Sequence, residues 1–335
     1  MHDELLVWYD KNRRTLPWRA LPGAIANPYY VYLSEVMLQQ TTVPTVISYF
    51  NRFITKWPTI EAFSRATLDE ILLEWQGLGY YSRAKNLKLA IEKIIKENRF
   101  PQSHEALIHY PGIGDYTSKA IASICFDQPV LPVDGNVIRV FSRIFNISTP
   151  LPALKKEIII KAEQVGAGKR PGDFAQALMD LGSLICKPKN PKCDECPLMS
   201  LCDGYKNKTY QSLPVRLEKI NKPMRYGTAY VIQNHGQIII EKRSDKGLLA
   251  NLWGVPTSGW NLFLKDEKKI GNAQDKERVK HVFTHFTLYL DIHYIKIFPC
   301  EVVKLKSNQK FVTLDEIQNY ALPTLMKKIV QKLDL

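Results

Sequence analysis

Apolar residues in the first 185 positions recur at spacings of three and four, the period of a helix that buries one face. One such helix should begin at Asn27-Pro28, because asparagine is a good N-cap and proline suits the first helical turn. Further helices are predicted after Thr42, Thr67, Ser82, Asp115 and Asp173, with breaks at Gly77, Gly79, Gly112 and Gly114. Residues 1–185 are therefore predicted to form a compact all-α domain.

The pattern changes after residue 202. Residues 203–224 are mostly polar with little apolar period, so they are predicted to be an interdomain linker. Beyond them, β-rich runs surround Asn234-His235-Gly236, a turn typical of a β-hairpin. Strands are predicted over 228–232 and 237–242, within 281–298 and near Phe311-Val312, with a closing helix over 323–333. Residues 225–335 should form a second, smaller α+β domain.

Charge adds a candidate partner to this picture. The chain has 335 residues, long enough for two domains, and carries a formal charge of +13. An enzyme of small metabolites has no need to attract polyanions, so nucleic acid is the leading partner. A basic surface without a specific partner is the alternative, and charge alone does not separate the two.

The sequence also bears on location. Residues 1–6 lack the charged start and apolar stretch of a secretory signal, and no apolar run approaches membrane-spanning length. We therefore expect no membrane association and a reducing, cytoplasmic setting, associated with the nucleoid if the protein is bacterial. There, Cys125 and Cys300 are expected to be core thiols rather than a disulfide. The sequence carries no oligomer signal, so a monomer is expected.

Four of the six cysteines crowd into residues 186–202. Cys186, Cys193, Cys196 and Cys202 follow the pattern C-x6-C-x2-C-x5-C directly after a predicted helix. Four thiolates in one short loop can surround a [4Fe-4S] cluster. Structural zinc is the rival, but zinc sites usually pair two tight Cys-x2-Cys knuckles and only one is present. The spacing favours the cluster.

Two short segments further along the chain, each just before a predicted helix, contain residues that could contact DNA or take part in catalysis. Pro111-Gly112-Ile113-Gly114 lies between two predicted helices, as in a helix-hairpin-helix, where bare backbone N–H groups approach a DNA phosphate. An ordinary turn is the alternative. Twenty residues later, Val133-Asp134-Gly135-Asn136-Val137 puts Asp134 at the start of another helix, where a plain N-cap is the simplest interpretation.

Glu35 is the other acid of interest, because it lies in the most apolar helix of the first third, between Leu33 and Leu38. Burial there would disfavour the carboxylate and raise its pKa, as a general acid requires. An exposed glutamate between apolar ridges is the alternative, and composition does not separate the two.

Taken together, these strings resemble adenine DNA glycosylases of the MutY type over roughly residues 5–202. The resemblance rests on Leu16-Pro17-Trp18-Arg19, Leu33 to Thr41, Gly77-Leu78-Gly79-Tyr80-Tyr81, the Pro111 to Gly114 hairpin, Val133 to Val137 and the cysteine quartet, in that order. It implies excision of adenine paired with 8-oxoguanine or guanine in double-stranded DNA. It also implies a helix-hairpin-helix catalytic domain over 1–185, one [4Fe-4S] cluster in the 186–202 loop and a Nudix-like 8-oxoguanine recognition domain over 225–335.

The resemblance also implies roles for individual residues. Glu35 would protonate adenine at N7, and Asp134 would stabilise the oxocarbenium-like sugar or bond to it transiently, the two-carboxylate logic of sugar hydrolysis. Tyr116 and Asn136 would support Asp134 and the water. Gln40 and Tyr80, with Thr41 and Leu78 beside them, would enter the base stack while the target base is flipped out, and Gly112 and Gly114 would contact DNA. Trp18, Arg19 and Gln176 would line the adenine pocket, although each could equally be a packing residue.

Three features depart from the family pattern. Phe283-Thr284-His285 matches the loop that touches 8-oxoguanine, but threonine replaces serine. The glycine- and glutamate-rich run of catalytic Nudix enzymes is missing, so nucleotide hydrolysis is not expected. The stretch from Ala20 to Asn27 is longer than usual and could shift Arg19.

Two other functions remain open from the sequence. Endonuclease III-like glycosylases, which act on pyrimidine lesions, share the hairpin and cysteine spacing but have a lysine nucleophile where this chain has Tyr116. Without that amine, we expect a monofunctional glycosylase; Lys119, one turn further on, is expected to be a DNA contact or an exposed charge. A non-catalytic iron-sulfur DNA-binding protein is the other alternative, and the presence of both Glu35 and Asp134 argues against it.

Overall fold

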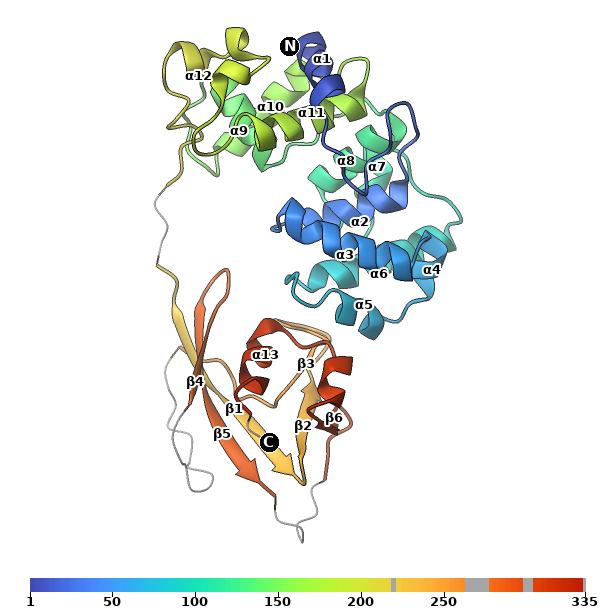
Figure 1. Ribbon diagram of the computed structural model, residues 1–335, viewed down its shortest axis with the longest axis vertical. Helices are drawn as coiled ribbons and strands as arrows, with labels where there is room; N and C mark the ends of the chain where they lie inside the picture. The colour runs from blue at the N-terminus through green and yellow to red at the C-terminus, as the bar shows by residue number, and fades with distance from the viewer. Residues whose placement is uncertain (218–220, 263–276, 298–303, 334–335) are drawn as a thin grey trace. The chain divides into compact units, whose positions relative to one another are not determined.

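A computed structural model describes residues 1–217, 221–262, 277–297 and 304–333. The chain divides into two compact units (Figure 1). The first unit comprises Met1–Arg65 and Asn86–Glu218, and the second comprises Ala66–Lys85 and Lys219–Leu335. The segment 66–85 therefore belongs with the C-terminal part of the chain, which differs from the continuous 1–185 domain expected from the sequence.

Helices make up the N-terminal two thirds of the chain, as the apolar spacing predicted. Their bounds are α1 His2–Asn12, α2 Pro28–Leu38, α3 Val43–Lys56, α4 Ile60–Arg65, α5 Leu68–Glu74, α6 Ser82–Lys96, α7 His104–Leu107, α8 Asp115–Phe126, α9 Gly135–Ile144, α10 Leu154–Val165, α11 Pro171–Leu184 and α12 Asp203–Lys206.

Local sequence explains where several of these helices begin. The side chain of Asn27 accepts hydrogen bonds from the backbone N–H groups of Tyr29 and Tyr30, so the predicted cap of α2 is confirmed. Thr67 and Glu70 form a reciprocal capping box at the start of α5. Each cap satisfies N–H groups that the helix itself leaves unpaired.

The core of the first unit includes a cluster between α1, α9, α10 and α11, which gather together in Figure 1. Leu5, Phe141, Ile158 and Phe174 are fully buried in it. The partly buried side chains of Cys186, Cys196 and Cys202 pack against the same cluster. The cysteine loop therefore packs against a cluster that includes α9, the helix that begins at Asp134 and Asn136.

The linker predicted over 203–224 is wrong for its first half. Residues 203–206 form α12, which packs against α9. Leu213 is buried, and its carbonyl oxygen accepts a hydrogen bond from Arg143 at 3.0 Å. These contacts lie between segments far apart in the sequence, so the polar composition of 203–217 did not reveal them. Residues 218–220 lie outside the described residues.

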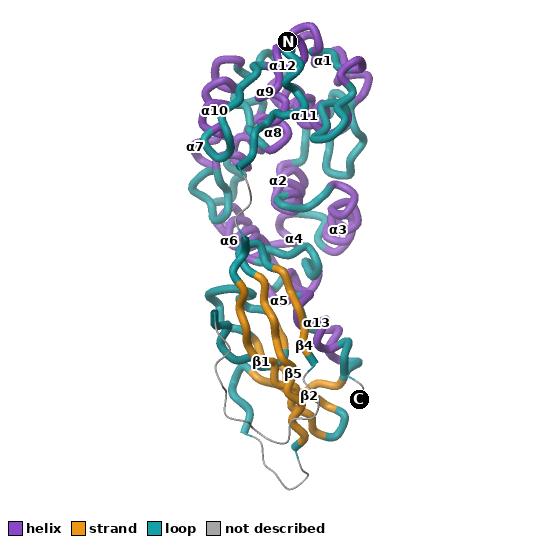
Figure 2. The backbone as a smooth tube through the Cα atoms, turned by 90° about the vertical axis from the view of Figure 1, so that its left-hand side faces the viewer, coloured by secondary structure: helices purple, strands orange, loops and turns teal. Residues whose placement is uncertain are grey.

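The C-terminal part of the second unit contains a mixed sheet. Its strands are β1 Met224–Asn234, β2 Gln237–Lys242, β3 Trp253–Gly254, β4 Arg278–Val282, β5 Thr287–Lys296 and β6 Gln309–Thr313. The order is β3-β2-β1-β5-β4, with β6 paired to β2. Only the β1–β5 pairing among these is parallel, and β1, β5 and β4 run side by side in Figure 2. Helix α13, Thr324–Val330, contributes Leu325, Met326 and Ile329 to the core of this sheet.

The predicted hairpin is confirmed at the β1–β2 connection. His235 and Gly236, its two turn residues, have φ values of 45° and 75°, as a tight two-residue hairpin requires. The expected combination of an all-α part with a smaller α+β part is thus confirmed. In the part of the chain that the structure describes, no helix is long and apolar enough to cross a membrane.

Candidate active site

Glu35 lies on α2, a helix that is buried on almost every side. Its neighbours Ser34 and Met37 are fully buried, and Glu35 itself is only 6% exposed. The hydroxyl of Tyr116, on α8, donates a hydrogen bond to Glu35 Oε2 at 2.7 Å. The exposed glutamate considered as an alternative is therefore excluded.

Burial raises the pKa of Glu35 to about 7. The hydrogen bond from Tyr116 opposes this shift, the nearby charge of Asp134 adds to it, and the charge of Arg19 opposes it. Burial also raises the pKa of Tyr116 well above its ordinary value, so its hydroxyl remains a donor. Glu35 is thus a carboxyl that can hold its proton near neutral pH.

Asp134 is the N-cap of α9, as the simplest interpretation predicted, but the cap uses only one of its oxygens. Oδ1 accepts hydrogen bonds from the backbone N–H groups of Asn136 and Val137 at 2.8 and 2.7 Å. Oδ2 accepts a further bond from the side-chain amide of Asn136 at 2.7 Å. Burial raises the pKa of Asp134, while these three hydrogen bonds favour its charged form.

The two carboxyls meet in one open pocket. Glu35, Tyr116, Asp134 and Asn136 all line it, although α2 and α9 are separated by almost a hundred residues. Gln40 and Thr41, which follow α2, line the same pocket. The structure therefore brings together the four residues expected to act on the sugar and base. It places the Tyr116 hydroxyl on Glu35, whereas we expected that residue to support Asp134.

A chain of hydrogen bonds leads from Asp134 to the cysteine loop. The Asn136 side chain, bonded to Asp134, accepts from Arg139 Nη2 at 2.8 Å, and Arg139 Nε donates to the carbonyl of Cys186 at 2.7 Å. The backbone of Gly182 lies against Asn136, where a Cβ atom would come within 2.6 Å of the asparagine Cβ. The orientation of Asp134 is thus tied to the backbone of the first cysteine.

The four cysteines Cys186, Cys193, Cys196 and Cys202 line a single cavity, with apolar walls from α9 and α11. Two short 3-10 turns, Cys193–Glu195 and Met199–Leu201, fold the loop so that its cysteines share one space. The buried guanidinium of Arg143 donates to Cys186 Sγ at 3.3 Å and to the Lys187 carbonyl at 2.7 Å. The residues present therefore suit a group that takes four thiolates from one loop.

The three candidates for the adenine pocket also lie together. Trp18, Arg19 and Gln176 line a cavity that includes Glu35. Arg19 does not point into it unpaired, because its two terminal nitrogens donate to Asp180 at 2.6 and 2.8 Å. Although the loop after Arg19 is longer than usual, the guanidinium group of Arg19 is fixed in place by this ion pair with Asp180.

The glycine hairpin has the geometry expected of a helix-hairpin-helix. It joins α7 to α8, and Gly112 has a φ of 73°. A Cβ atom at Gly112 would lie 2.6 Å from the Cβ of Asn86, so both the conformation and the space require glycine. Gly114 is the N-cap residue of α8.

The two residues expected to enter the base stack share an unusual backbone conformation. Gln40 has a φ of 60° and Tyr80 a φ of 46°, a region that side chains other than glycine, asparagine and aspartate seldom adopt. Arg83 supports the turn before Tyr80 by donating to the carbonyls of Leu78 and Gly79, both at 3.2 Å. Leu78 is buried, whereas the ring of Tyr80 is 46% exposed.

Phe283, Thr284 and His285 are the first three of the four residues that connect β4 to β5. Phe283 packs against Phe286, with ring centroids 4.8 Å apart, while Thr284 and His285 are exposed. Within the second unit, the Thr284 hydroxyl and the Tyr80 hydroxyl are 2.6 Å apart. A residue expected to enter the base stack, Tyr80, is therefore in contact with one expected to touch 8-oxoguanine, Thr284.

Four residues of this site were missed from the sequence: Arg14, Arg139, Arg143 and Asp180. Asp180 offered a signal, since it is a charge in the apolar run Ala177-Leu178-Met179-Asp180-Leu181 and is fully buried. The arginines offered none, because on a basic chain each one is expected to be exposed.

Three family models match the chain. Residues 33–164 match a family described as HhH-GPD superfamily base excision DNA repair protein. Residues 186–202 match the iron-sulfur binding domain of endonuclease III, and residues 228–332 match a NUDIX domain. The helical part, the cysteine loop and the mixed sheet therefore each have a recognised relative, and the loop belongs to an iron-sulfur binding type.

Curated relatives match nearly the whole chain. An adenine DNA glycosylase of Buchnera aphidicola (subspecies Baizongia pistaciae) is 35% identical, covering 99% of this chain and 96% of the relative. The adenine DNA glycosylases of Mus musculus and Homo sapiens are 33% and 31% identical, and each match covers 97% of this chain, with 76% and 72% of the relatives covered.

Among solved structures, a thermostable thymine-DNA glycosylase is 28% identical with a TM-score of 0.53, covering 61% of this chain and 94% of that one. A trapped endonuclease III–DNA covalent intermediate, 22% identical with a TM-score of 0.50, shares the fold; it covers 62% of this chain and 94% of that one. By its likeness along its full length to the curated relatives, the chain belongs to the adenine DNA glycosylase family.

Proposed function

We propose that this protein is a monofunctional adenine DNA glycosylase that hydrolyses the N-glycosidic bond of adenine paired with 8-oxoguanine or guanine. The observation that carries the proposal is the shared pocket of a buried carboxyl, Glu35, and a half-buried one, Asp134, with different hydrogen-bond partners. Cleavage of a glycosidic bond needs one neutral and one ionised carboxyl, and such a pair supplies both.

Glu35 acts first, as the general acid. Adenine is a poor leaving group as an anion, so the Glu35 proton passes to N7 while the bond between C1′ and N9 breaks. The electron pair of that bond stays on N9, and the base departs as a neutral tautomer. A water then adds to C1′, and its proton returns to the Glu35 carboxylate, so that the acid is restored.

Asp134 acts on the sugar. As the C1′–N9 bond breaks, positive charge develops on the deoxyribose, and a carboxylate facing it lowers the energy of that state. The hydrogen bonds from Asn136 and Val137 fix the carboxylate before the reaction begins. The same group can stabilise the cation through space or bond to C1′ transiently.

This chain has a tyrosine where endonuclease III-like glycosylases have the lysine whose amine leads to strand cleavage. Tyr116 takes the position of the lysine nucleophile and is bonded to Glu35. The side-chain nitrogen of Lys119 is engaged in an ion pair with Asp115 at 3.0 Å. Borohydride trapping is therefore expected to yield no covalent complex with DNA.

We assign recognition of the DNA around the lesion to Gln40, Tyr80 and Thr284. Gln40 and Tyr80 hold strained backbone conformations, which are often kept where function needs them. The hydroxyl of Thr284 retains a donor and an acceptor where the family has serine, so hydrogen bonding to 8-oxoguanine remains available despite the added methyl group.

A cytoplasmic location is consistent with this function. The chromosome supplies the double-stranded substrate there, and the reducing conditions keep the cysteines available as cluster ligands.

The cysteine quartet would hold one [4Fe-4S] cluster, through Cys186, Cys193, Cys196 and Cys202. When bound, the cluster cross-links the loop and stabilises its fold. Arg143 and Arg139 fix the backbone of that loop through its carbonyls. Iron and acid-labile sulfide at about four each per chain are expected, and a single zinc ion would contradict this assignment.

The function can be tested by adenine release from a duplex containing one adenine:8-oxoguanine pair. We expect the full-length wild-type protein to release adenine, and Glu35→Gln to lower the single-turnover rate by roughly 10²- to 10⁴-fold. The matched control is Glu163→Gln, which changes an exposed glutamate on α10 and should keep the wild-type rate. A wild-type protein that releases no adenine would refute the function; a fully active Glu35→Gln would refute only the proton donor.

A further inference from the structure

Asp180, on α11, is a fully buried carboxylate that the glycosylase chemistry above does not use. Both of its oxygens are saturated by arginine. Arg14 donates from its backbone N–H to Oδ2 at 3.0 Å and from Nε to Oδ1 at 2.6 Å. Arg19 donates to the same two oxygens at 2.6 and 2.8 Å. One buried anion thus holds two guanidinium groups.

These arginines lie beside the general acid. Arg14, Arg19 and Glu35 line one cavity, and the side chain of Arg19 is only 7% exposed. Burial tends to lower the pKa of Arg19, but the hydrogen bonds and charge of Asp180 outweigh this and raise it. A permanent cation therefore forms part of the wall next to a carboxyl that must stay neutral.

Such a cation works against the acid step unless it is balanced. A guanidinium near a carboxyl stabilises the ionised form, and the charge of Arg19 does lower the pKa of Glu35. The planar fork of Arg19 is already engaged in a two-point ion pair with Asp180, so it is not available to form the same pair with Glu35.

We propose that Asp180 is a positioning residue for the acid step: by holding Arg19 in a buried ion pair, it keeps that cation in the pocket wall without letting it pair with Glu35. This inference rests on the proposed glycosylase function. Asp180 touches no reacting atom and acts only through Arg19 and Arg14.

None of the other groups around Glu35 offsets the positive charge of Arg19 in the way that Asp180 does. Tyr116 and Cys125, both on α8, are neutral because burial raises the pKa of each well above its ordinary range. Asp134 favours the protonated form of Glu35, but its carboxylate is committed to the α9 cap and to the sugar. The charged or titratable groups facing Glu35 or lining its pockets are Arg14, Arg19, Tyr116, Cys125, Asp134 and Lys155.

The test is the pH dependence of single-turnover adenine release by Asp180→Asn, which keeps the shape of the side chain but removes its charge. The wild-type rate should fall as pH rises through the pKa of Glu35, about 7. This fall in rate is the alkaline limb of the pH profile. In the variant, the unbalanced arginines should shift the alkaline limb to lower pH by roughly one unit, which lowers the rate about tenfold at pH values above it. At pH values below the limb, the rate should return toward the wild-type value.

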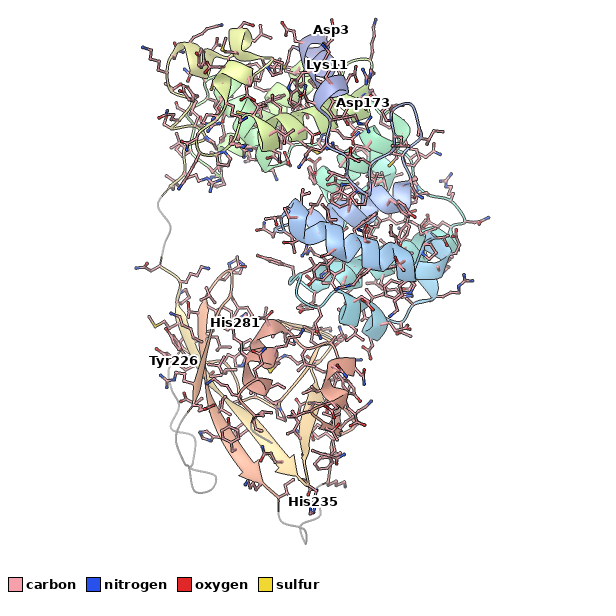
Figure 3. All side chains as sticks on the ribbon, viewed as in Figure 1. Asp3, Lys11, Asp173, Tyr226, His235 and His281 are labelled. Atoms are coloured by element: carbon pink, nitrogen blue, oxygen red, sulfur yellow. The ribbon has the colours of Figure 1, made fainter. Side chains whose placement is uncertain are left out.

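Asp173→Asn is the matched control. Asp173, labelled in Figure 3, lies in the first turn of the same helix and pairs with Arg170. It does not line the cavity that contains Glu35. Its limb should stay at the wild-type pH. An Asp180→Asn profile that is lowered equally at every pH, or that moves to higher pH, would overturn the proposal and leave Asp180 a purely structural residue.

A second variant guards against failure of Asp180→Asn to fold. Arg19→Gln removes the cation itself, so its limb should move to higher pH, the opposite direction. An unmoved limb in Arg19→Gln would also overturn the proposal. Because every comparison is made between active proteins, an inactive wild type, which refutes the glycosylase function, cannot be mistaken for either result.

Discussion

Two carboxyls are buried within the same helical unit, and their surroundings shift their pKa values in opposite directions. Glu35 is 6% exposed and Asp180 fully buried. Burial raises the pKa of Glu35 to about 7. Burial alone would also raise the pKa of Asp180, but the hydrogen bonds and charges of Arg19 and Arg14 outweigh it and hold that pKa below its ordinary value. Depth of burial therefore does not decide the charge of an acid in this protein.

The partners explain the difference. Glu35 has a neutral hydroxyl from Tyr116 and a neighbouring carboxyl in Asp134, neither of which can neutralise a negative charge. Asp180 accepts four hydrogen bonds from two guanidinium-bearing residues. A buried charge is tolerated only when it is paired. Asp180 therefore stays ionised, whereas Glu35 can keep its proton.

The largest effect on stability should come from Asp180→Asn. Removing one partner of a buried ion pair leaves the other charge uncompensated, so the free energy of unfolding at pH 7 should fall by about 3 kcal/mol or more. Chemical denaturation can measure this, with Asp173→Asn as the control. A loss no larger than that of the control would show that the arginines reach water once Asp180 is gone.

The stability of this pair should also depend on pH. Because the pKa of Asp180 is lower in the folded protein, its contribution is present above the ordinary carboxyl pKa and is lost as pH falls through the folded value. The difference between wild type and Asp180→Asn should therefore shrink at acid pH. Constancy of that difference down to acid pH would contradict the lowered pKa.

Glu35→Gln should show the opposite pH dependence. The pKa of Glu35 rises on folding from 4.5 to about 7, so wild-type stability is fully present below pH 4.5 and declines as pH rises through 7. Glutamine does not titrate. Relative to wild type, Glu35→Gln should thus gain about 3 kcal/mol in the free energy of unfolding between acid pH and pH 8.

Denaturation of Glu35→Gln and Glu163→Gln at pH 5 and pH 8 would measure this gain. Glu163 is exposed on α10, so its variant should follow the wild type at both values. Equal stability differences at the two pH values for Glu35→Gln would mean that Glu35 is ionised in the folded protein, and the contrast with Asp180 would disappear.

The smallest effect is expected for Tyr116→Phe. The Tyr116 hydrogen bond lowers the pKa of Glu35, so its removal should move the limb of the rate profile to higher pH. The rate below the limb should change only a few-fold, because a single neutral hydrogen bond is worth about 1 kcal/mol. A limb that moves to lower pH would show that Tyr116 instead keeps Glu35 protonated.

Much of the fold followed from local patterns. The three- and four-residue apolar spacing predicted the helices, the Asn27-Pro28 cap predicted the start of α2, and Asn234-His235-Gly236 predicted a hairpin. The Leu33 to Leu38 string also indicated that Glu35 lies in an apolar helix. These features depend on hydrogen bonds and side-chain spacing within a few residues, so the sequence carries them directly.

The charge state of the site was decided only by tertiary contacts. Arg19 meets Asp180 across 161 positions, Tyr116 meets Glu35 across 81, and the segment 66–85 joins the C-terminal unit. No local pattern predicts which distant side chain will lie beside a buried carboxyl. The pKa of such a group depends on burial and on charges that only folding brings within a few ångströms, and that is why Glu35 and Asp180 differ.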